Sequence, residues 1–180
     1  MAVIYLVTGG ARSGKSAFSE SLAKDLGADK VLYIATLSES DSEMIKRIAR
    51  HRRLRPAAWR TLEIITEIDF ETISEKVILL DCLSGFVSNI LIAHEEIEDE
   101  ELIGLVLRKV AALTTSARKH KKTLIVVTNE VGSGIVPAYK LGRVFRDALG
   151  LANQYVAKQA DNVASMTVGI ATVLKGEFPD

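Results

Sequence analysis

The chain has 180 residues, 48% of them hydrophobic, and its 23 basic and 23 acidic side chains cancel to a formal net charge of zero. This length and composition predict a single domain over residues 1–180, and the balanced charge excludes an overall electrostatic basis for binding nucleic acid or an anionic membrane. A single cysteine, no signal peptide and no apolar stretch near the roughly 20 residues that span a bilayer predict a cytoplasmic protein without a membrane span or an internal disulfide.

The first elements predict a strand, a phosphate-binding loop and a helix. Residues 3–7 are continuously apolar, as expected for a parallel strand covered on both faces. A helix over residues 15–26 should end at Gly27. Between strand and helix, the P-loop pattern is matched by Gly9, Gly10, Ala11, Arg12, Ser13, Gly14, Lys15 and Ser16. In such a loop the lysine reaches the β and γ phosphates and the following hydroxyl ligates Mg²⁺, so Lys15 and Ser16 predict binding of a nucleoside triphosphate.

The next segment completes a βαβ unit. Residues 31–35 predict a second buried strand, which a right-handed crossover connects to the first. A helix should begin at Ser40 or Asp41 and end before Pro56, because serine and aspartate cap helices and proline disfavours the helical conformation of the residue before it. Residues 61–66 predict a short strand.

The second half continues the alternation of strand and helix. Residues 77–80 predict a strand that ends at Asp81, and residues 123–128 predict another. Between them, acidic residues 98–101 should begin a helix and basic residues 118–122 should end it, which complements the helix dipole. A long helix is expected after Pro137, and residues 163–173 should form a strand or hairpin. This pattern predicts a three-layer α/β domain with a mainly parallel sheet.

Ligands of such sheets bind outside the carboxyl ends of the strands, so the polar residues there are candidates for a site. Besides the P-loop they are Thr36, Ser38, Asp81 and residues 129–132. P-loop enzymes place an acid at the end of a strand to hold Mg²⁺, usually through water, which suits Asp81. The alternative is that Asp81 caps a helix starting near Ser84.

Residues 47–56 contain one histidine among five arginines. Nearby positive charge lowers the pKa of an imidazole, so His51 is expected to be neutral at pH 7 and therefore nucleophilic. The guanidinium groups would bind a polyphosphate and stabilise a departing pyrophosphate. The alternative is a basic surface helix with an incidental histidine.

Several motifs spread along most of the chain carry a family resemblance. They are residues 7–16 and 33–36, His51, residues 55–56 and 59–61, Glu63, and residues 127–132, 134–137, 145–147 and 153–154. In these motifs the chain resembles the bifunctional adenosylcobinamide kinase/adenosylcobinamide-phosphate guanylyltransferase family of cobalamin biosynthesis. The resemblance implies a P-loop NTPase domain of RecA-like topology that assembles as a homo-oligomer, a trimer.

The resemblance further implies two reactions and a set of site residues. ATP or GTP phosphorylates the aminopropanol hydroxyl of adenosylcobinamide, a corrinoid. GTP then donates GMP to His51, and the guanylyl group passes to adenosylcobinamide phosphate, giving adenosylcobinamide-GDP and pyrophosphate. Lys15 is implied to be catalytic, and Ser16 and Asp81 to hold Mg²⁺. Nucleotide binding is implied for the P-loop and for Ile34, Ala35, Thr36, Arg52, Arg53, Leu54, Arg55, Glu63 and Asp81.

Two departures and two alternatives accompany this interpretation. Some relatives carry a second histidine where this chain has Arg50, which makes His51 the one nucleophile candidate here. Others carry glutamate in place of Asp81, so metal and guanine both remain open as its partner. A plain P-loop small-molecule or nucleoside kinase would form no covalent intermediate, and a nucleotide-dependent switch would hydrolyse slowly and respond to no corrinoid.

Overall fold

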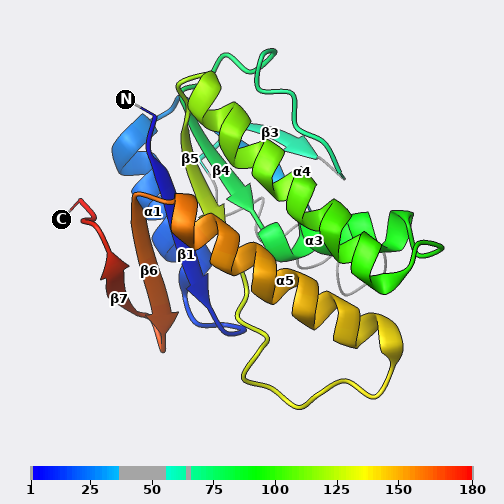
Figure 1. Ribbon diagram of the computed structural model, residues 1–180. Helices are drawn as coiled ribbons and strands as arrows, with labels where there is room; N and C mark the ends of the chain where they lie inside the picture. The colour runs from blue at the N-terminus through cyan, green and yellow to red at the C-terminus, as the bar shows by residue number, and fades with distance from the viewer. Residues whose placement is uncertain (1, 37–55, 64–65, 180) are drawn as a thin grey trace.

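Seven strands form one sheet in the computed structural model, which describes residues 2–36, 56–63 and 66–179 (Figure 1). They are β1 (Ile4–Gly9), β2 (Val31–Ala35), β3 (Arg60–Glu63), β4 (Val77–Asp81), β5 (Thr123–Val127), β6 (Asn162–Thr167) and β7 (Ile170–Lys175). Their order is β3-β2-β4-β5-β1-β6-β7, and every pair is parallel except β6 and β7. The predicted mainly parallel sheet is confirmed.

The strand that precedes the P-loop lies between β5 and β6. The next strand in the chain, β2, is separated from β1 by both β4 and β5. This is the RecA-like order that the resemblance implied, and it leaves the carboxyl ends of β1, β5 and β4 side by side at one edge of the sheet.

Helices cover both faces of the sheet and make the three expected layers (Figure 1). Helix α1 (Lys15–Gly27) packs on one face, where Leu22 and Ala23 join Tyr5 in one apolar cluster. Helices α3 (Leu83–Ala93), α4 (Asp99–Lys119) and α5 (Lys140–Gln159) cover the other face, against Ile4 and Leu6. Because neighbouring residues of β1 face opposite clusters, both of its faces are buried, which explains the continuous apolar runs of the central strands.

Most expected elements are confirmed with small changes of boundary. Residues 163–173 form the hairpin of β6 and β7, and residues 61–66 contain the end of β3. Helix α3 was expected only within the alternative for Asp81, as a helix starting near Ser84, and it begins at Leu83. The helix expected over residues 40–55 lies outside the described residues. Among the described helices, none combines the length and the apolar character that crossing a bilayer requires.

Gly27 ends α1 for a different reason from the one expected. A C-terminal glycine usually adopts a positive φ, but here the positive φ, 48°, belongs to Ala28. A Cβ on Gly27 would lie 2.7 Å from Cγ2 of Val31 and 3.0 Å from Cβ of Val77. Glycine is therefore needed at this position for the close approach of the helix end to β2 and β4.

An ion pair between β3 and the loop before β4 predicts a pH-dependent stability. Arg60 donates from Nε and Nη2 to the two carboxylate oxygens of Glu75, at 2.6 and 2.8 Å. These hydrogen bonds lower the pKa of Glu75 to about 2 from an ordinary value of 4.5. Since the folded-state pKa is the lower one, the pair stabilises the fold fully above pH 4.5 and loses its effect as the pH falls toward about 2.

Glu75→Gln is therefore expected to reduce the free energy of unfolding at pH 7 and to make little difference at pH 2. The side chain of Arg60 is 44% exposed, so solvent screening limits the loss to about 1 kcal/mol. Urea unfolding at several pH values measures this loss of unfolding free energy, with Glu71→Gln, at an exposed position of the same loop, as the control. An equal difference between Glu75→Gln and wild type at both pH values would contradict this assignment.

Candidate active site

The P-loop has the strand, loop and helix context that its sequence pattern requires. β1 ends at Gly9 and α1 begins at Lys15, with exposed residues between them at Gly10, Ala11 and Arg12. The Lys15 side chain is buried, and its Nζ donates a hydrogen bond to the carbonyl oxygen of Gly10 at 2.8 Å. The ammonium group therefore lies over the loop, beside a helix N-terminus whose backbone amides favour anions.

Two P-loop glycines are required by backbone shape and by close packing. Gly9 has a φ of 155°, and a Cβ there would lie 2.6 Å from both the Met166 carbonyl oxygen and the Ser13 hydroxyl. Gly14 has a φ of 96°, and a Cβ there would lie 3.1 Å from Cα of Gly169. Gly169 also donates its backbone N–H to the Ser13 carbonyl oxygen at 2.9 Å. The turn between β6 and β7 thus packs against the P-loop and supports its backbone.

Other predicted site residues lie in one row across the carboxyl ends of the strands. Glu63 of β3 pairs with Ala35 of β2, Ala35 pairs with Asp81 of β4, and Asp81 pairs with Val127 of β5. Val127 in turn pairs with Val7, two residues before the P-loop begins. The fold therefore brings Ala35, Glu63 and Asp81 to the same edge as the P-loop, as predicted. Ile34 differs, because its side chain is fully buried in the core on the α3–α5 face.

Asp81 is held by a buried tyrosine. The Tyr33 hydroxyl donates to Oδ2 of Asp81 at 2.6 Å, which fixes the carboxylate with one oxygen occupied. The alternative prediction, that Asp81 caps the following helix, is wrong, because Cys82 occupies the N-cap of α3 and no side chain caps it. The sequence did not indicate Tyr33 as a partner of Asp81, since a tyrosine within an apolar strand has the pattern of an ordinary core residue.

Thr36 connects the end of β2 to the start of α3. Its hydroxyl donates to the Cys82 carbonyl oxygen at 2.6 Å and accepts from the Cys82 N–H at 2.9 Å. Its own carbonyl oxygen accepts from Nδ2 of Asn89 on α3 at 2.7 Å. The Thr36 hydroxyl is thus engaged within the protein, and it fixes the position of the segment that follows Asp81.

The segment after β5 connects the P-loop to two helices. The Glu130 N–H donates to the Gly9 carbonyl oxygen at 3.0 Å. Asn129 donates from Nδ2 to the Ser84 hydroxyl of α3 at 2.7 Å, and Asn153 of α5 donates from Nδ2 to the Asn129 carbonyl oxygen at 3.1 Å. Movement of the loop beginning at Asn129 would therefore be transmitted to the P-loop backbone.

Cys82 is a buried core residue and is not suited to nucleophilic chemistry. Burial raises the pKa of its thiol, and the Asp81 carboxylate raises it further, while the Ser84 hydrogen bond and the Lys15 ammonium oppose the shift. A thiol with a raised pKa remains protonated near neutral pH and is a poor nucleophile.

The remaining predicted residues lie outside the described part of the chain. They are Ser38, His51 and the residues that follow this histidine, Arg52, Arg53, Leu54 and Arg55. Within residues 2–36, 56–63 and 66–179, no group of three or more histidine, cysteine, aspartate or glutamate side chains could hold a metal. A P-loop Mg²⁺ needs no such group, because phosphate oxygens and water supply most of its ligands.

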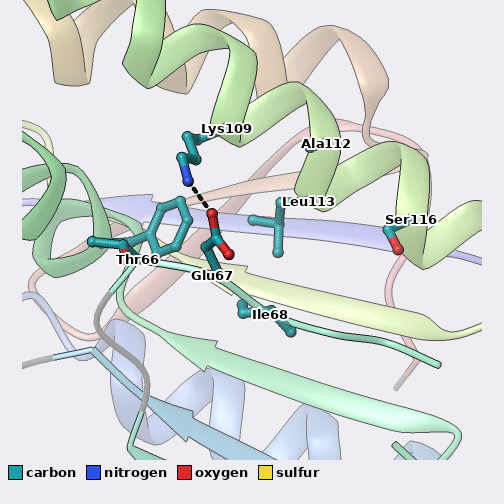
Figure 2. Close-up of a pocket in the computed structure, with 8 residues that line it drawn as sticks. Thr66, Glu67, Ile68, Lys109, Ala112, Leu113 and Ser116 are labelled. Carbon is teal, nitrogen blue, oxygen red and sulfur yellow. Dashed lines mark hydrogen bonds and ion pairs between the residues drawn. The ribbon is translucent and has the colours of Figure 1, made fainter. Parts of the chain in front are cut away.

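A further pocket, beside α4, contains none of the predicted site residues (Figure 2). It lies between residues 66–68 and α4, and its volume is about 220 Å³. Figure 2 shows the Lys109 ammonium on α4 directed at the Glu67 carboxylate, with which it forms an ion pair. Leu113 and Ile68 line the pocket beside this pair.

The loop over α1, the carboxylate on β4 and the strand order together define the chain as a P-loop nucleotide-binding protein. Within that class, a family model described as "Cobinamide kinase / cobinamide phosphate guanyltransferase" matches residues 5–174. The chain belongs to this family of enzymes, and the resemblance drawn from its motifs is confirmed.

Two curated relatives agree with this assignment, and one solved structure shares the fold. The chain is 39% identical to "Bifunctional adenosylcobalamin biosynthesis protein CobU" of Salmonella typhimurium over 183 residues, which cover 96% of this chain and all of the relative. It is 37% identical to "Bifunctional adenosylcobalamin biosynthesis protein CobP" of Pseudomonas aeruginosa, covering 96% and 97% of the two chains. The flagellar accessory protein FlaH of Methanocaldococcus jannaschii shares only the fold, with a TM-score of 0.50, 16% identity, and coverage of 98% of this chain and 82% of that one.

Proposed function

We propose that this enzyme catalyses both reactions of its family on one corrinoid. ATP or GTP first phosphorylates the hydroxyl of adenosylcobinamide. GTP then supplies GMP to adenosylcobinamide phosphate, with adenosylcobinamide-GDP and pyrophosphate as products. The observation that carries the proposal is the P-loop, in which a buried lysine is fixed on the backbone at the carboxyl edge of the sheet.

The kinase step depends on positioning and charge rather than on covalent chemistry of the protein. Lys15 and the loop amides bind the β and γ phosphates. The Ser13 hydroxyl is buried in this loop without a hydrogen-bond partner among the described residues, which suits a site completed by a phosphate oxygen. Mg²⁺ would be held by Ser16 and by Asp81, through the carboxylate oxygen that does not accept from Tyr33. The ion would neutralise charge on the transferred phosphoryl group.

The transferase step uses His51 as a nucleophile. The neutral imidazole nitrogen attacks the α-phosphorus of GTP, a P–N bond forms, the bond to the β-phosphate oxygen breaks and pyrophosphate leaves. A phosphate oxygen of adenosylcobinamide phosphate then attacks the same phosphorus and releases the imidazole. Arg52, Arg53 and Arg55 stabilise the charge on the leaving pyrophosphate. Further nucleotide contacts are proposed for Ala35, Leu54, Glu63 and Asp81. For Ile34 and Thr36, whose side chains are buried, the proposed contacts use the backbone.

We also propose that residues 1–180 form one domain and that the protein is a homotrimer. The edge strand β7 exposes Ile170, Val173 and Leu174, and unpaired apolar edges are usually covered in native proteins. Sedimentation velocity measures the oligomeric state directly.

The test of the proposed function is covalent labelling. Incubation with GTP labelled at the α-phosphorus, in the presence of Mg²⁺, should label the protein with an acid-labile, base-stable GMP group. Adenosylcobinamide phosphate should then discharge the label. A protein that phosphorylates adenosylcobinamide without ever becoming labelled is a plain kinase, and the transferase half of the proposal is then wrong.

Tyr33→Phe is expected to raise the Mg²⁺ concentration needed for half-maximal kinase activity by about tenfold, because a hydrogen bond to a charged group contributes about 1.5–3 kcal/mol. The rate at saturating Mg²⁺ should fall less, since the carboxylate itself remains. The matched control is Tyr5→Phe, a buried tyrosine of the same apolar cluster whose ring packs on Phe178. An unchanged Mg²⁺ dependence in Tyr33→Phe would show that Asp81 does not act through the metal.

A further inference from the structure

An uncharged groove lies between α3 and the start of α5. We call it the α3–α5 groove; its volume is about 260 Å³, and it is lined by Ser88, Leu91, Ile92, Tyr139, Leu141 and Phe145. Ile92, Tyr139 and Leu141 remain exposed, so they add nothing to the core. Apart from the hydroxyls of Ser88 and Tyr139, these side chains offer only apolar surface. The groove therefore suits an apolar edge or face of a ligand that also carries neutral hydrogen-bonding groups, with the rest of the ligand outside the groove.

The two helices that line the groove also contact the edge of the sheet where the nucleotide site lies. On α3, Ser88 is next to Asn89, which donates to the carbonyl oxygen of Thr36 at 2.7 Å. On α5, Asn153 donates to the carbonyl oxygen of Asn129, and Phe145 lies eight residues earlier, about 12 Å along the helix at the usual rise. The groove and the carboxyl edge of the sheet are therefore connected through α3 and α5.

The loop between the P-loop edge and the groove is fixed by two arginines. Arg146 donates to the Gly132 carbonyl oxygen at 2.6 Å, and Arg143 donates to the Ala138 carbonyl oxygen at 2.7 Å. A Cβ on Gly142 would lie 2.6 Å from the ring of Tyr139, so glycine there lets this ring rest on the helix. The loop nevertheless exposes Ile135, Val136 and Tyr139 to solvent. An apolar surface held in place in this way indicates a binding site rather than a folding requirement.

We propose that the α3–α5 groove binds the corrin macrocycle of the corrinoid substrate. This inference rests on the proposed function, because it assumes a corrinoid acceptor. The faces of a corrin ring carry many methyl groups and its edges carry neutral amides, which match the apolar lining and the two hydroxyls. The hydroxyl that accepts the phosphoryl group lies at the end of a flexible arm. A macrocycle in the groove therefore leaves the arm to reach along α3 toward the P-loop, and the ring itself stays clear of the nucleotide.

The test compares two substitutions on the same helix. Leu141 in the groove and Leu151 outside it are 39% and 42% exposed, so Leu141→Asp and Leu151→Asp place the same charge at equally accessible positions. Leu141→Asp is expected to weaken adenosylcobinamide binding, measured by equilibrium dialysis without nucleotide, by roughly tenfold or more, the value of one buried leucine contact. It should raise KM for the corrinoid similarly and leave GMP labelling by GTP unchanged. Leu151→Asp should match wild type in all three. Tyr139→Ser, in the loop, is a second variant expected to act like Leu141→Asp.

Each outcome decides the proposal. Wild-type affinity for adenosylcobinamide in both Leu141→Asp and Tyr139→Ser overturns the proposal. An altered oligomeric state of these variants with unaltered affinity also overturns it, because the groove would then be a subunit interface. No binding of adenosylcobinamide by wild type overturns both this inference and the proposed function. If adenosylcobinamide binding depends on Leu141 but the wild-type protein transfers no phosphoryl group, the inference is supported and only the proposed function is contradicted.

Discussion

Replacing Lys15 with alanine is expected to abolish both proposed activities. The Lys15 ammonium is fixed on the Gly10 carbonyl oxygen at 2.8 Å, directly over the loop. Its substitution removes a positive charge at the place where the β and γ phosphates would lie, whether a phosphoryl group is transferred or pyrophosphate leaves. Removing one preorganised group of this kind costs on the order of 10²- to 10³-fold in rate. The measurement is kcat/KM of the kinase reaction together with the rate of GMP labelling.

The Lys15→Ala experiment needs a control for changes in α1 itself. Lys24→Ala removes the same charge from an exposed position on the same helix, and it should retain wild-type activity. Both variants should unfold near the wild-type temperature, because alanine favours the helix and neither change opens the main apolar core. Near wild-type turnover in Lys15→Ala would mean that the phosphates are not bound by this loop, and the proposed site would be wrong for both reactions.

The central strands and the P-loop were predictable because their signals are local. β1, β2, β4 and β5 are covered on both faces, so each appears in the sequence as a continuous apolar run that ends where polar site residues begin. The P-loop pattern then identifies β1 without knowledge of its neighbours. The placement of Asp81 at the same edge followed from the general rule for the carboxyl ends of parallel strands.

Helix α3 was expected only through the alternative for Asp81, because it lacks the periodic contrast that identifies a surface helix. Seven of its 11 residues are buried, including Ser84 and Gly85, so polar and small residues occur on its buried side. A helix buried on most sides has no polar stripe to show a period of 3.6 residues. No side-chain cap marks its start at Cys82 either.

The contacts that complete the site join residues far apart in the chain. Tyr33 and Asp81 are 48 positions apart and meet because β2 lies beside β4. The support of the P-loop by Gly169 depends in the same way on β6 lying beside β1. Local hydrophobic patterns do not determine which strands are neighbours, so these partners become visible only in the structure.

His51→Ala is expected to eliminate GMP labelling and guanylyl transfer while leaving phosphorylation of adenosylcobinamide largely intact. Without the imidazole there is no protein nucleophile to form the P–N bond, so the loss should exceed about 10³-fold. The kinase step uses Lys15, Ser16 and Asp81 and needs no histidine. The measurement pairs GMP labelling of the protein with the initial rate of adenosylcobinamide phosphorylation on the same preparation.

The two other histidines provide matched controls and also test the reasoning behind the choice. His94 lies just past the end of α3 beside acidic residues, and His120 lies at the end of α4. Neither has the cluster of five arginines that surrounds His51 in the sequence and that would bind a triphosphate. His94→Ala and His120→Ala should therefore be labelled like wild type. Labelling that persists in His51→Ala and disappears in one of the controls would move the nucleophile to another part of the fold. If both activities fall together in His51→Ala, the histidine segment serves both reactions. One nucleotide site would then accommodate two kinds of attack, by a hydroxyl at the γ-phosphorus and by an imidazole at the α-phosphorus.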